Sequence, residues 1–460
     1  LAPASAVVRN VATTAIGTDL IGRKTELRRL KEMWERACAS DPQFLVISGE
    51  PGMGKTHLAD VLRRWIETSP AVVRHLHCYP ERQHSPLYPV IGLLRSVMGI
   101  SVDDTLAQQQ HTLIHYLEQH HPAIAKQAAP LLMSMLSIAT EESPVLSPRQ
   151  RKLQTLDMLL IMLDSMALRH PVLLLIEDAQ WLDVTSLDLL ERLVHRRDKI
   201  ALFTLVTARP EFKPSWLEQS AVLKLSPLKA EHIAKLARNV EANLPREAVD
   251  RIVQRADGIP LYAEEMARYS RESEDNIPST LHYLLLARLD AVPHARRLLQ
   301  LAATIGRTFD TALLQRVSGL GVQDLDIALK ELVEARLIAA IPPSDMYQFH
   351  HALIQEAAYT TQIAPDLRAA HLKVARAFEI HYAQRAAQQP SEMARHYTLA
   401  GDPRAALPWR LLAGRQALRV CACIEAVDEL QAGLELIPRL PNSTDKRALE
   451  LELLLALGQA

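Results

Sequence analysis

Cysteine, aromatic residues and excess charge are all scarce in this sequence. Its 460 residues include only four cysteines, which show neither a C-x-x-C pair nor the spacing of a disulfide framework, so we expect a reducing, cytoplasmic setting. The formal net charge is −1, which gives no overall field to attract nucleic acid or acidic lipid. Aromatic residues make up only 5%, whereas the abundance of leucine and alanine predicts a helix-rich protein.

Long hydrophobic runs are also missing from the sequence. One of the longest, 158–163, ends at Asp164 and is much shorter than a membrane-spanning helix, so we expect no membrane partner. Residues 1–16 lack the apolar core of a signal peptide, and the chain begins with Leu1 rather than methionine. We therefore expect a fragment of a longer polypeptide. The chain is also too long for one hydrophobic core, which predicts several domains.

One segment has the spacing G-x-x-x-x-G-K-T of a phosphate-binding loop. It consists of Gly49, Glu50, Pro51, Gly52, Met53, Gly54, Lys55 and Thr56. The glycines let backbone N–H groups approach phosphate oxygens, Lys55 supplies charge for the β- and γ-phosphates, and the Thr56 hydroxyl is placed to bind Mg²⁺. An apolar run precedes the loop and a helical pattern follows it. We therefore predict an ATP- or ADP-binding site with Mg²⁺, rather than a surface turn that matches by chance.

A second acidic element ends the apolar run 172–176 with Glu177 and Asp178. Carboxylates at the end of a buried strand suit a Mg²⁺–nucleotide site, because one can hold the metal while another orients the attacking water. We predict that Glu177 and Thr56 hold the Mg²⁺ and that Glu177 and Asp178 are catalytic. The alternative is a strand end that carries two solvated acids.

The order of predicted elements indicates an α/β P-loop NTPase with a doubly wound parallel sheet, followed by all-helical, winged-helix and TPR-like α-solenoid segments. The predicted strands are 44–48, 72–78, 172–176, 201–207 and 221–225. We predict a linker over 1–20, the P-loop ATPase domain over 21–230, a small helical domain over 231–275, a winged-helix-like domain over 276–362 and helical repeats over 363–460. Residues 281–360 contain seven Arg/Lys and eight Asp/Glu, so we do not expect this segment to bind DNA.

Several motifs, taken in their order along the chain, resemble those of STAND-class signalling ATPases. Residues 177–183 (EDAQWLD) resemble the acidic-acidic-x-x-Trp-x-Asp signature of these P-loop proteins, which are found with cyclase, kinase or LuxR-type effector domains. Residues 21–27 (IGRKTEL) resemble an element whose backbone contacts adenine in the family. The resemblance therefore implies nucleotide contacts at Ile21, Gly22 and Arg23.

Three further segments extend the resemblance. Residues 207–210 (TARP) resemble a sensor segment, which implies that Arg209 reports the γ-phosphate; an ordinary surface arginine is the alternative. Residues 258–261 (GIPL) resemble a motif whose proline, here Pro260, packs on adenine. Residues 349–356 (FHHALIQE) resemble a winged-helix segment whose histidine, here His351, reaches the β-phosphate in the ADP form; a buried structural histidine is the alternative.

The resemblance implies a weak ATPase, since Glu177 and Asp178 stand where the family more often has Asp and then Glu. The leading hypothesis is an ATP-binding signal-transduction switch that regulates an effector domain in cis but outside this chain. Its helical tail would receive a protein or small-molecule inducer, and a nucleotide-dependent oligomer is a further expectation. The alternatives are a nucleotide-stabilised scaffold without significant ATPase activity, or a fragment of a LuxR-type transcriptional regulator or nucleotide cyclase.

Two histidine groups offer a weaker signal. His75 and His77 lie two residues apart on the predicted strand 72–78, where we expect packing in the core or at the strand end. His111 and His115 have the i, i+4 spacing of helical metal ligands, but no carboxylate completes an H-E-x-x-H pattern. We therefore do not expect a zinc site at His111 and His115.

Overall fold

The computed structural model describes residues 20–101, 104–139, 147–196, 198–272, 280–342, 345–442 and 444–460. The predicted linker 1–20 lies outside the described residues except for Leu20. In the part of the chain that is described, no helix is both long enough and apolar enough to cross a membrane.

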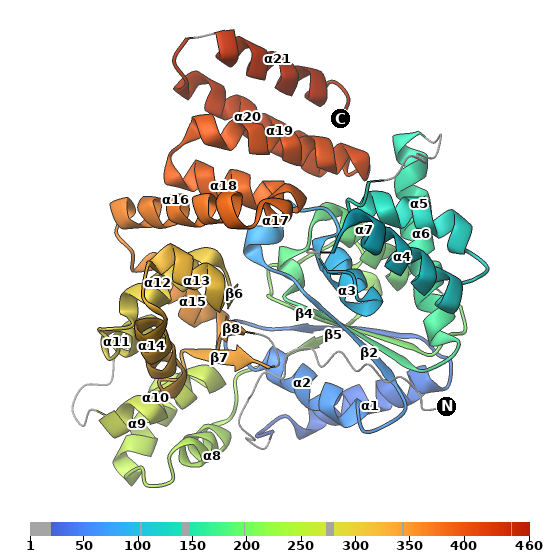
Figure 1. Cartoon of the computed structure of the whole chain (residues 1–460). Helices are drawn as coiled ribbons and strands as arrows, with labels where there is room; N and C mark the ends of the chain where they lie inside the picture. Colours follow the sequence, from blue (N-terminus) through green and yellow to red (C-terminus); the bar gives the residue numbers. More distant parts are fainter. Residues whose placement is uncertain are drawn as a thin grey trace.

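A five-stranded parallel sheet organises the N-terminal half of the chain (Figure 1). Its order is β2-β3-β4-β1-β5, with bounds β1 Gln43–Ser48, β2 Val72–His77, β3 Val172–Glu177, β4 Leu202–Ala208 and β5 Ala221–Lys224. Every position of β3 and β4 is buried, as expected for central strands that are covered on both faces. Each strand lies within one residue of its predicted bounds, because near-continuous apolar runs are typical of such strands.

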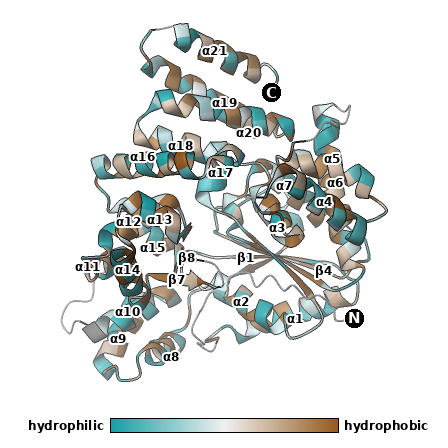
Figure 2. Cartoon of the chain, in the orientation of Figure 1, coloured by the Kyte–Doolittle hydropathy of each residue, from teal (hydrophilic) through white to brown (hydrophobic). Residues whose placement is uncertain are grey.

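Helices cover both faces of this sheet. Side chains of α1 (Lys24–Cys38) and α2 (Lys55–Ile66) pack on one face, and those of α6 (Pro148–Ala167) and α7 (Val184–Val194) pack on the other. A separate apolar cluster joins α6 to α3 (Tyr88–Met98), α4 (Leu106–His120) and α5 (Ala125–Met135). Figure 2 shows the central strands coloured mainly toward the hydrophobic end, whereas the peripheral helices mix both colours.

A three-helix group follows the sheet. It comprises α8 (Ala230–Val240), α9 (Arg246–Ala256) and α10 (Pro260–Glu272), which share a small apolar core. The next segment contains the helices α11 (Leu281–Asp290), α12 (Arg296–Ile305), α13 (Thr311–Ser318), α14 (Val322–Glu334) and α15 (Ala352–Thr360). Its antiparallel sheet has the order β6-β8-β7, with β6 Thr308–Asp310, β7 Ile338–Ile341 and β8 Met346–Phe349. Strands β7 and β8 form a hairpin, whereas the three-residue β6 is too short to show a sequence pattern.

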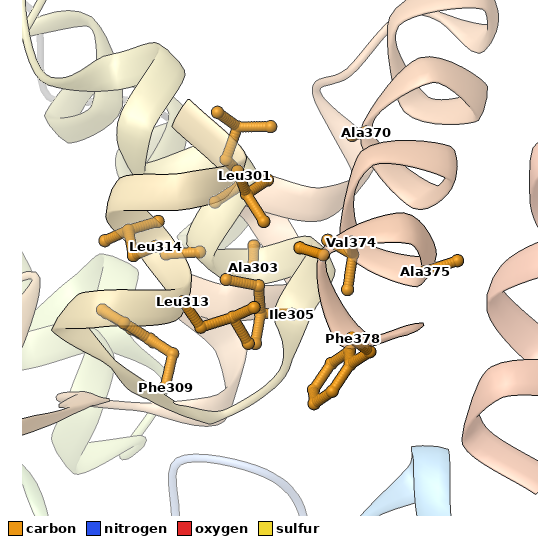
Figure 3. Packing of buried hydrophobic residues seen from close by; sticks show 14 of the residues in the cluster. Leu301, Ala303, Ile305, Phe309, Leu313, Leu314, Ala370, Val374, Ala375 and Phe378 are labelled. Carbon is orange, nitrogen blue, oxygen red and sulfur yellow. The ribbon is translucent and has the colours of Figure 1, made fainter. Parts of the chain in front are cut away.

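The C-terminal tail is helical and stacks as successive pairs, at the top of Figure 1. Its helices are α16 (Ala364–His381), α17 (Ala383–Gln388), α18 (Pro390–Ala400), α19 (Pro403–Arg419), α20 (Cys423–Leu436) and α21 (Thr444–Leu457). One apolar core runs from α11 into this tail. Figure 3 shows Phe309 and Leu313 on one side of that core and Val374 and Phe378 of α16 on the other. The predicted fold class, a parallel α/β sheet followed by a helix-rich region, is confirmed.

Candidate nucleotide-binding site

The phosphate-binding loop lies between the end of β1 and the start of α2. Gly52 and Gly54 have φ values of 81° and 84°, in the left-handed region that favours glycine. A Cβ on Gly52 would lie 3.1 Å from the side chains of both Ile259 and Leu261, whereas one on Gly54 would meet nothing within 4 Å. Among the described residues, no side chain caps the start of α2, so its first amides are free to bind an anion.

Lys55 is buried at the centre of this loop. Its Nζ donates hydrogen bonds to the carbonyl oxygens of Gly49 at 2.7 Å and Glu50 at 3.1 Å. Burial lowers the pKa of Lys55, and the nearby Asp178 carboxylate opposes that shift. The ammonium group is therefore held within the loop, where a phosphate oxygen can take the place of the two carbonyl groups.

The predicted adenine-side residues adjoin the loop. Arg23 is buried, and its guanidinium donates to Ser226 O at 2.6 Å and to Met53 O at 3.5 Å. The Leu261 N–H donates to Gly52 O at 3.2 Å, which places the start of α10, and hence Pro260, against the loop. Ile21, Arg23 and Pro260 line one cavity with residues 51–57, whereas Gly22 does not line it. Gly22 instead packs so closely on α8 that a Cβ there would lie 2.8 Å from the His232 ring.

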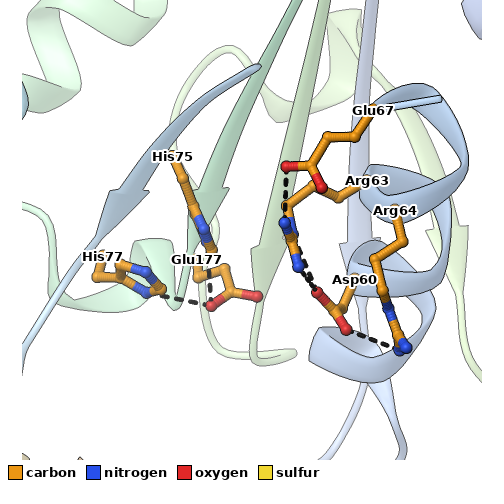
Figure 4. Close-up of polar contacts among 7 residues, drawn as sticks. All are labelled: Asp60, Arg63, Arg64, Glu67, His75, His77 and Glu177. Carbon is orange, nitrogen blue, oxygen red and sulfur yellow. Dashed lines mark hydrogen bonds and ion pairs between the residues drawn. The ribbon is translucent and has the colours of Figure 1, made fainter. Parts of the chain in front are cut away.

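The two predicted acids take different positions. Glu177 is buried, and its Oε2 lies 3.3 Å from His75 Nε2 and 3.2 Å from His77 Nδ1 (Figure 4). Burial alone would raise the pKa of Glu177, but the two imidazoles hold it well below its usual range. Thr56 and Glu177 line the same cavity. Their pairing around Mg²⁺ stays a prediction, because the Glu177 carboxylate contacts the two histidines.

Asp178 turns away from the strand with a left-handed φ of 57°. Its N–H donates to Thr207 Oγ1 at 3.1 Å, and its Oδ1 accepts from Gln180 Nε2 at 3.2 Å. The other oxygen, Oδ2, lies 3.8 Å from Arg307 Nη1. The negative charge of Asp178 raises the pKa of Lys55 more than that of any other acid near the loop.

Arg209 follows β4 and lines the cavity. Its N–H donates to Gln180 Oε1 at 3.1 Å, and its guanidinium lies 5.7 Å from the centre of the Trp181 ring. Gln180 therefore joins the predicted sensor segment to Asp178. We did not predict this role for Gln180, since nothing in the sequence separates it from an ordinary polar residue.

His351 also lines the cavity, although it lies about 300 residues beyond the loop in the sequence. It precedes α15, and burial lowers the pKa of His351 to about 3, helped by its neighbours His350 and Arg307. The imidazole is therefore neutral near pH 7 and can donate a single hydrogen bond to an acceptor.

The cavity has a volume of about 740 Å³ and is lined by widely separated parts of the chain. Four arginines that the sequence reasoning missed contribute to its wall; they are Arg268 in α10, Arg307, Arg336 and Arg395 in α18. No local pattern marks them, because each comes from a different element. With Arg23, Lys55 and Arg209 they bring seven cationic side chains to the wall, which also carries six acidic ones. The cations that lie nearest the loop can contact a polyphosphate.

The residues present fit a nucleotide with Mg²⁺. The open left-handed turn at Gly54, the buried Lys55 and the uncapped start of α2 are suited to phosphate oxygens. The Thr56 hydroxyl and the Asp178 carboxylate line the same cavity and supply the oxygen ligands that Mg²⁺ prefers.

Comparisons with known proteins agree with this geometry. Residues 19–206 match the family model described as the AAA ATPase domain. Residues 19–206 are therefore similar to an AAA ATPase domain, and the parallel sheet with its loop shows that this part of the chain has the P-loop NTPase fold.

The similarity to two other proteins extends beyond that domain. The crystal structure of a STAND (signal transduction ATPase with numerous domains) protein with a tetratricopeptide repeat sensor, from Pyrococcus horikoshii, superposes with a TM-score of 0.50 at 13% identity. That superposition covers 96% of this chain and 64% of the other, and it shows a shared fold. An uncharacterized protein of Rhizobium meliloti is 27% identical over an alignment of 478 positions, and that alignment covers 98% of this chain. The chain spans about half the length of that relative, 46%.

Proposed function

We propose that this chain is an ATP-binding switch of the STAND type, in which the bound nucleotide controls the position of the helical tail. The observation that carries the proposal is the composition of the cavity wall. The phosphate loop, the three-helix group, the segment around His351 and the tail helix α18 all contribute residues to it. A ligand that contacts several movable parts can favour one arrangement over another only if it binds the two arrangements differently.

Two buried polar contacts also join the tail to the ATPase domain. Arg82 Nη2 in the 3₁₀ turn Pro80–Arg82 lies 2.7 Å from Glu392 Oε2 in α18. Glu425 Oε1 in α20 accepts hydrogen bonds from the N–H and the hydroxyl of Thr185, both at 2.8 Å. Because Glu81 and Pro80 line the cavity next to the first of these contacts, a change at the nucleotide can reach α18 directly.

The same geometry supports a slow ATPase. Asp178 is the acid best placed to orient a water molecule near the loop, and its Oδ2 lies 3.8 Å from Arg307 Nη1. The Asp178 carboxylate is therefore paired with an arginine of the C-terminal part, and movement of that part would free the carboxylate to contact a water molecule. Output through an effector domain in cis, an inducer at the tail and nucleotide-dependent oligomerisation are further parts of the proposal.

Two measurements test the proposal. The first is a direct titration with ATP and Mg²⁺, in which Lys55→Ala should weaken binding by about 100-fold, since a charge-assisted contact to phosphate contributes about 3 kcal/mol. Lys330→Ala, which removes an exposed lysine of α14, is the matched control and should bind like the native chain. Retained affinity in Lys55→Ala would overturn the proposal.

The second measurement separates the switch from a nucleotide-stabilised scaffold. In a single-turnover assay the switch should release phosphate slowly, and Asp178→Asn should slow the release further. A scaffold would release none over hours, and the substitution would then change nothing.

A further inference from the structure

We propose that His75, His77 and Glu177 form a binding site for a transition-metal ion of the Zn²⁺ class. One nitrogen of each imidazole and one carboxylate oxygen lie within 4.8 Å of one another. Glu177 Oε2 is 3.3 Å from His75 Nε2 and 3.2 Å from His77 Nδ1. Two ligand atoms bound at about 2.0–2.1 Å to a tetrahedral ion lie about 3.3–3.4 Å apart. These two separations therefore already suit a shared ion.

The sheet fixes the three side chains on one face. His75 and His77 alternate along β2, so both point to the side of the sheet that α2 covers, and Glu177 is the register partner of His77 on β3. The two imidazole ring centres lie 3.8 Å apart. Ligands carried by two paired strands need little reorganisation to bind an ion. Figure 4 shows both rings directed toward the Glu177 carboxylate.

The ordinary alternative is hydrogen-bonded packing at the strand end, as the sequence suggested. One observation argues against it. His75 Nε2 is buried and makes no hydrogen bond of good geometry to any described residue, although it lies 3.3 Å from the carboxylate. A buried nitrogen without such a bond is unfavourable, whereas an ion would use its lone pair.

The donor set also indicates which ions bind. Imidazole nitrogens with one carboxylate suit Zn²⁺, Co²⁺ and Fe²⁺, whereas Mg²⁺ and Ca²⁺ prefer oxygen ligands. His77 and Glu177 line the large cavity, and the His77 side chain is 35% exposed. A fourth ligand, such as water, can therefore enter from the cavity. An ion there would occupy the carboxylate that was predicted to hold Mg²⁺.

Cobalt titration of the full chain, after treatment with a chelator, tests the site. Co²⁺ should bind with one equivalent and give the visible absorption of a four- or five-coordinate ion, and Zn²⁺ but not excess Mg²⁺ should displace it. His75→Gln and Glu177→Gln should each weaken binding by about 100-fold, as expected when one of three protein ligands is lost. The matched control is the double variant His111→Gln/His115→Gln, which removes the exposed histidine pair of α4 and should leave the spectrum unchanged.

The outcomes decide between site and packing. An unchanged affinity in His75→Gln, or a native chain that binds no Co²⁺, would overturn the site. Thermal stabilisation of the native chain by Zn²⁺ needs no variant, so it remains decisive if a substituted chain folds poorly. Nucleotide binding is measured separately with Mg²⁺ alone, so failure of the metal site leaves the proposed switch untouched.

Discussion

The buried ion pair between Arg82 and Glu392 should be the contact whose loss loosens the tail most. The Arg82 and Glu392 side chains are only 8% and 4% exposed, and the Arg82 guanidinium lies 4.7 Å from the centre of the Tyr88 ring. Glu392→Gln keeps the shape of the side chain but removes its charge. It leaves a buried guanidinium without its paired carboxylate, which costs about 3–5 kcal/mol.

The chain can avoid most of this penalty by separating α18 from the turn Pro80–Arg82 rather than by unfolding completely. We therefore expect amide hydrogen exchange in α18 and in that turn to accelerate by about 100-fold or more in Glu392→Gln, since 1.4 kcal/mol corresponds to a factor of ten. Amides of the central sheet should exchange as in the native chain. The assay is native-state hydrogen exchange followed by mass spectrometry, with urea unfolding as the global measure.

Two further variants make the reasoning refutable. Arg82→Met/Glu392→Leu removes both charges and should exchange within about tenfold of the native chain, because an apolar pair avoids the desolvation cost. Glu452→Gln breaks the half-exposed pair with Arg415, 2.9 Å apart, and should change stability by less than about 1 kcal/mol. Equal exchange rates of the α18 amides in Glu392→Gln and Glu452→Gln would contradict this role of the ion pair. So would α18 exchange that is as fast in the double variant as in Glu392→Gln.

Two other perturbations follow from the structure. Gly258→Ala should destabilise the chain by about 2–4 kcal/mol in urea unfolding, because φ is +72° and a Cβ would lie 2.5 Å from Pro227 Cβ. Gly319→Ala, with the same φ but open space around it, should cost only about 1 kcal/mol, and equal losses would contradict the steric explanation. Burial, with Glu425 nearby, raises the pKa of Asp183 to about 6. The folded chain therefore holds that proton more tightly than the unfolded chain, and the resulting stabilisation of about 3 kcal/mol is present below about pH 4 and lost as the pH rises through 6. Asp183→Asn should remove this part of the pH dependence between pH 4 and 6.5, and a parallel pH profile for both chains would contradict the shift.

The phosphate loop and the five strands could be predicted because their signals are local. The loop needs glycine at positions with left-handed φ, and Gly54 meets that need in the structure at 84°. The buried strands are short apolar runs that end at polar residues, so their bounds are visible within a window of a few residues. The strand β6 carries no such pattern in three residues, and it forms because β8 offers it a partner.

The surroundings of Glu177 could not be predicted in the same way. The sequence placed it at the end of a buried strand, whereas its contacts depend on which strands lie next to β3. In the sheet β4 separates β3 from the loop strand β1. Pairing with β2 in the register His77↔Glu177 brings two imidazoles to the carboxylate. The order of strands in a sheet depends on long-range packing, which a local pattern does not contain.

The sequence by itself determined that this chain has a phosphate-binding loop on a parallel α/β sheet and a helix-rich C-terminal part, because φ preferences and apolar periodicity act over a few residues. Only the tertiary structure decided which distant side chains share the cavity with the loop. Arg307 meets Asp178, His351 reaches the cavity, and Glu392 pairs with Arg82. These contacts depend on how separate elements pack against one another. The free energy of that packing is spread over many residue pairs that are far apart in the chain.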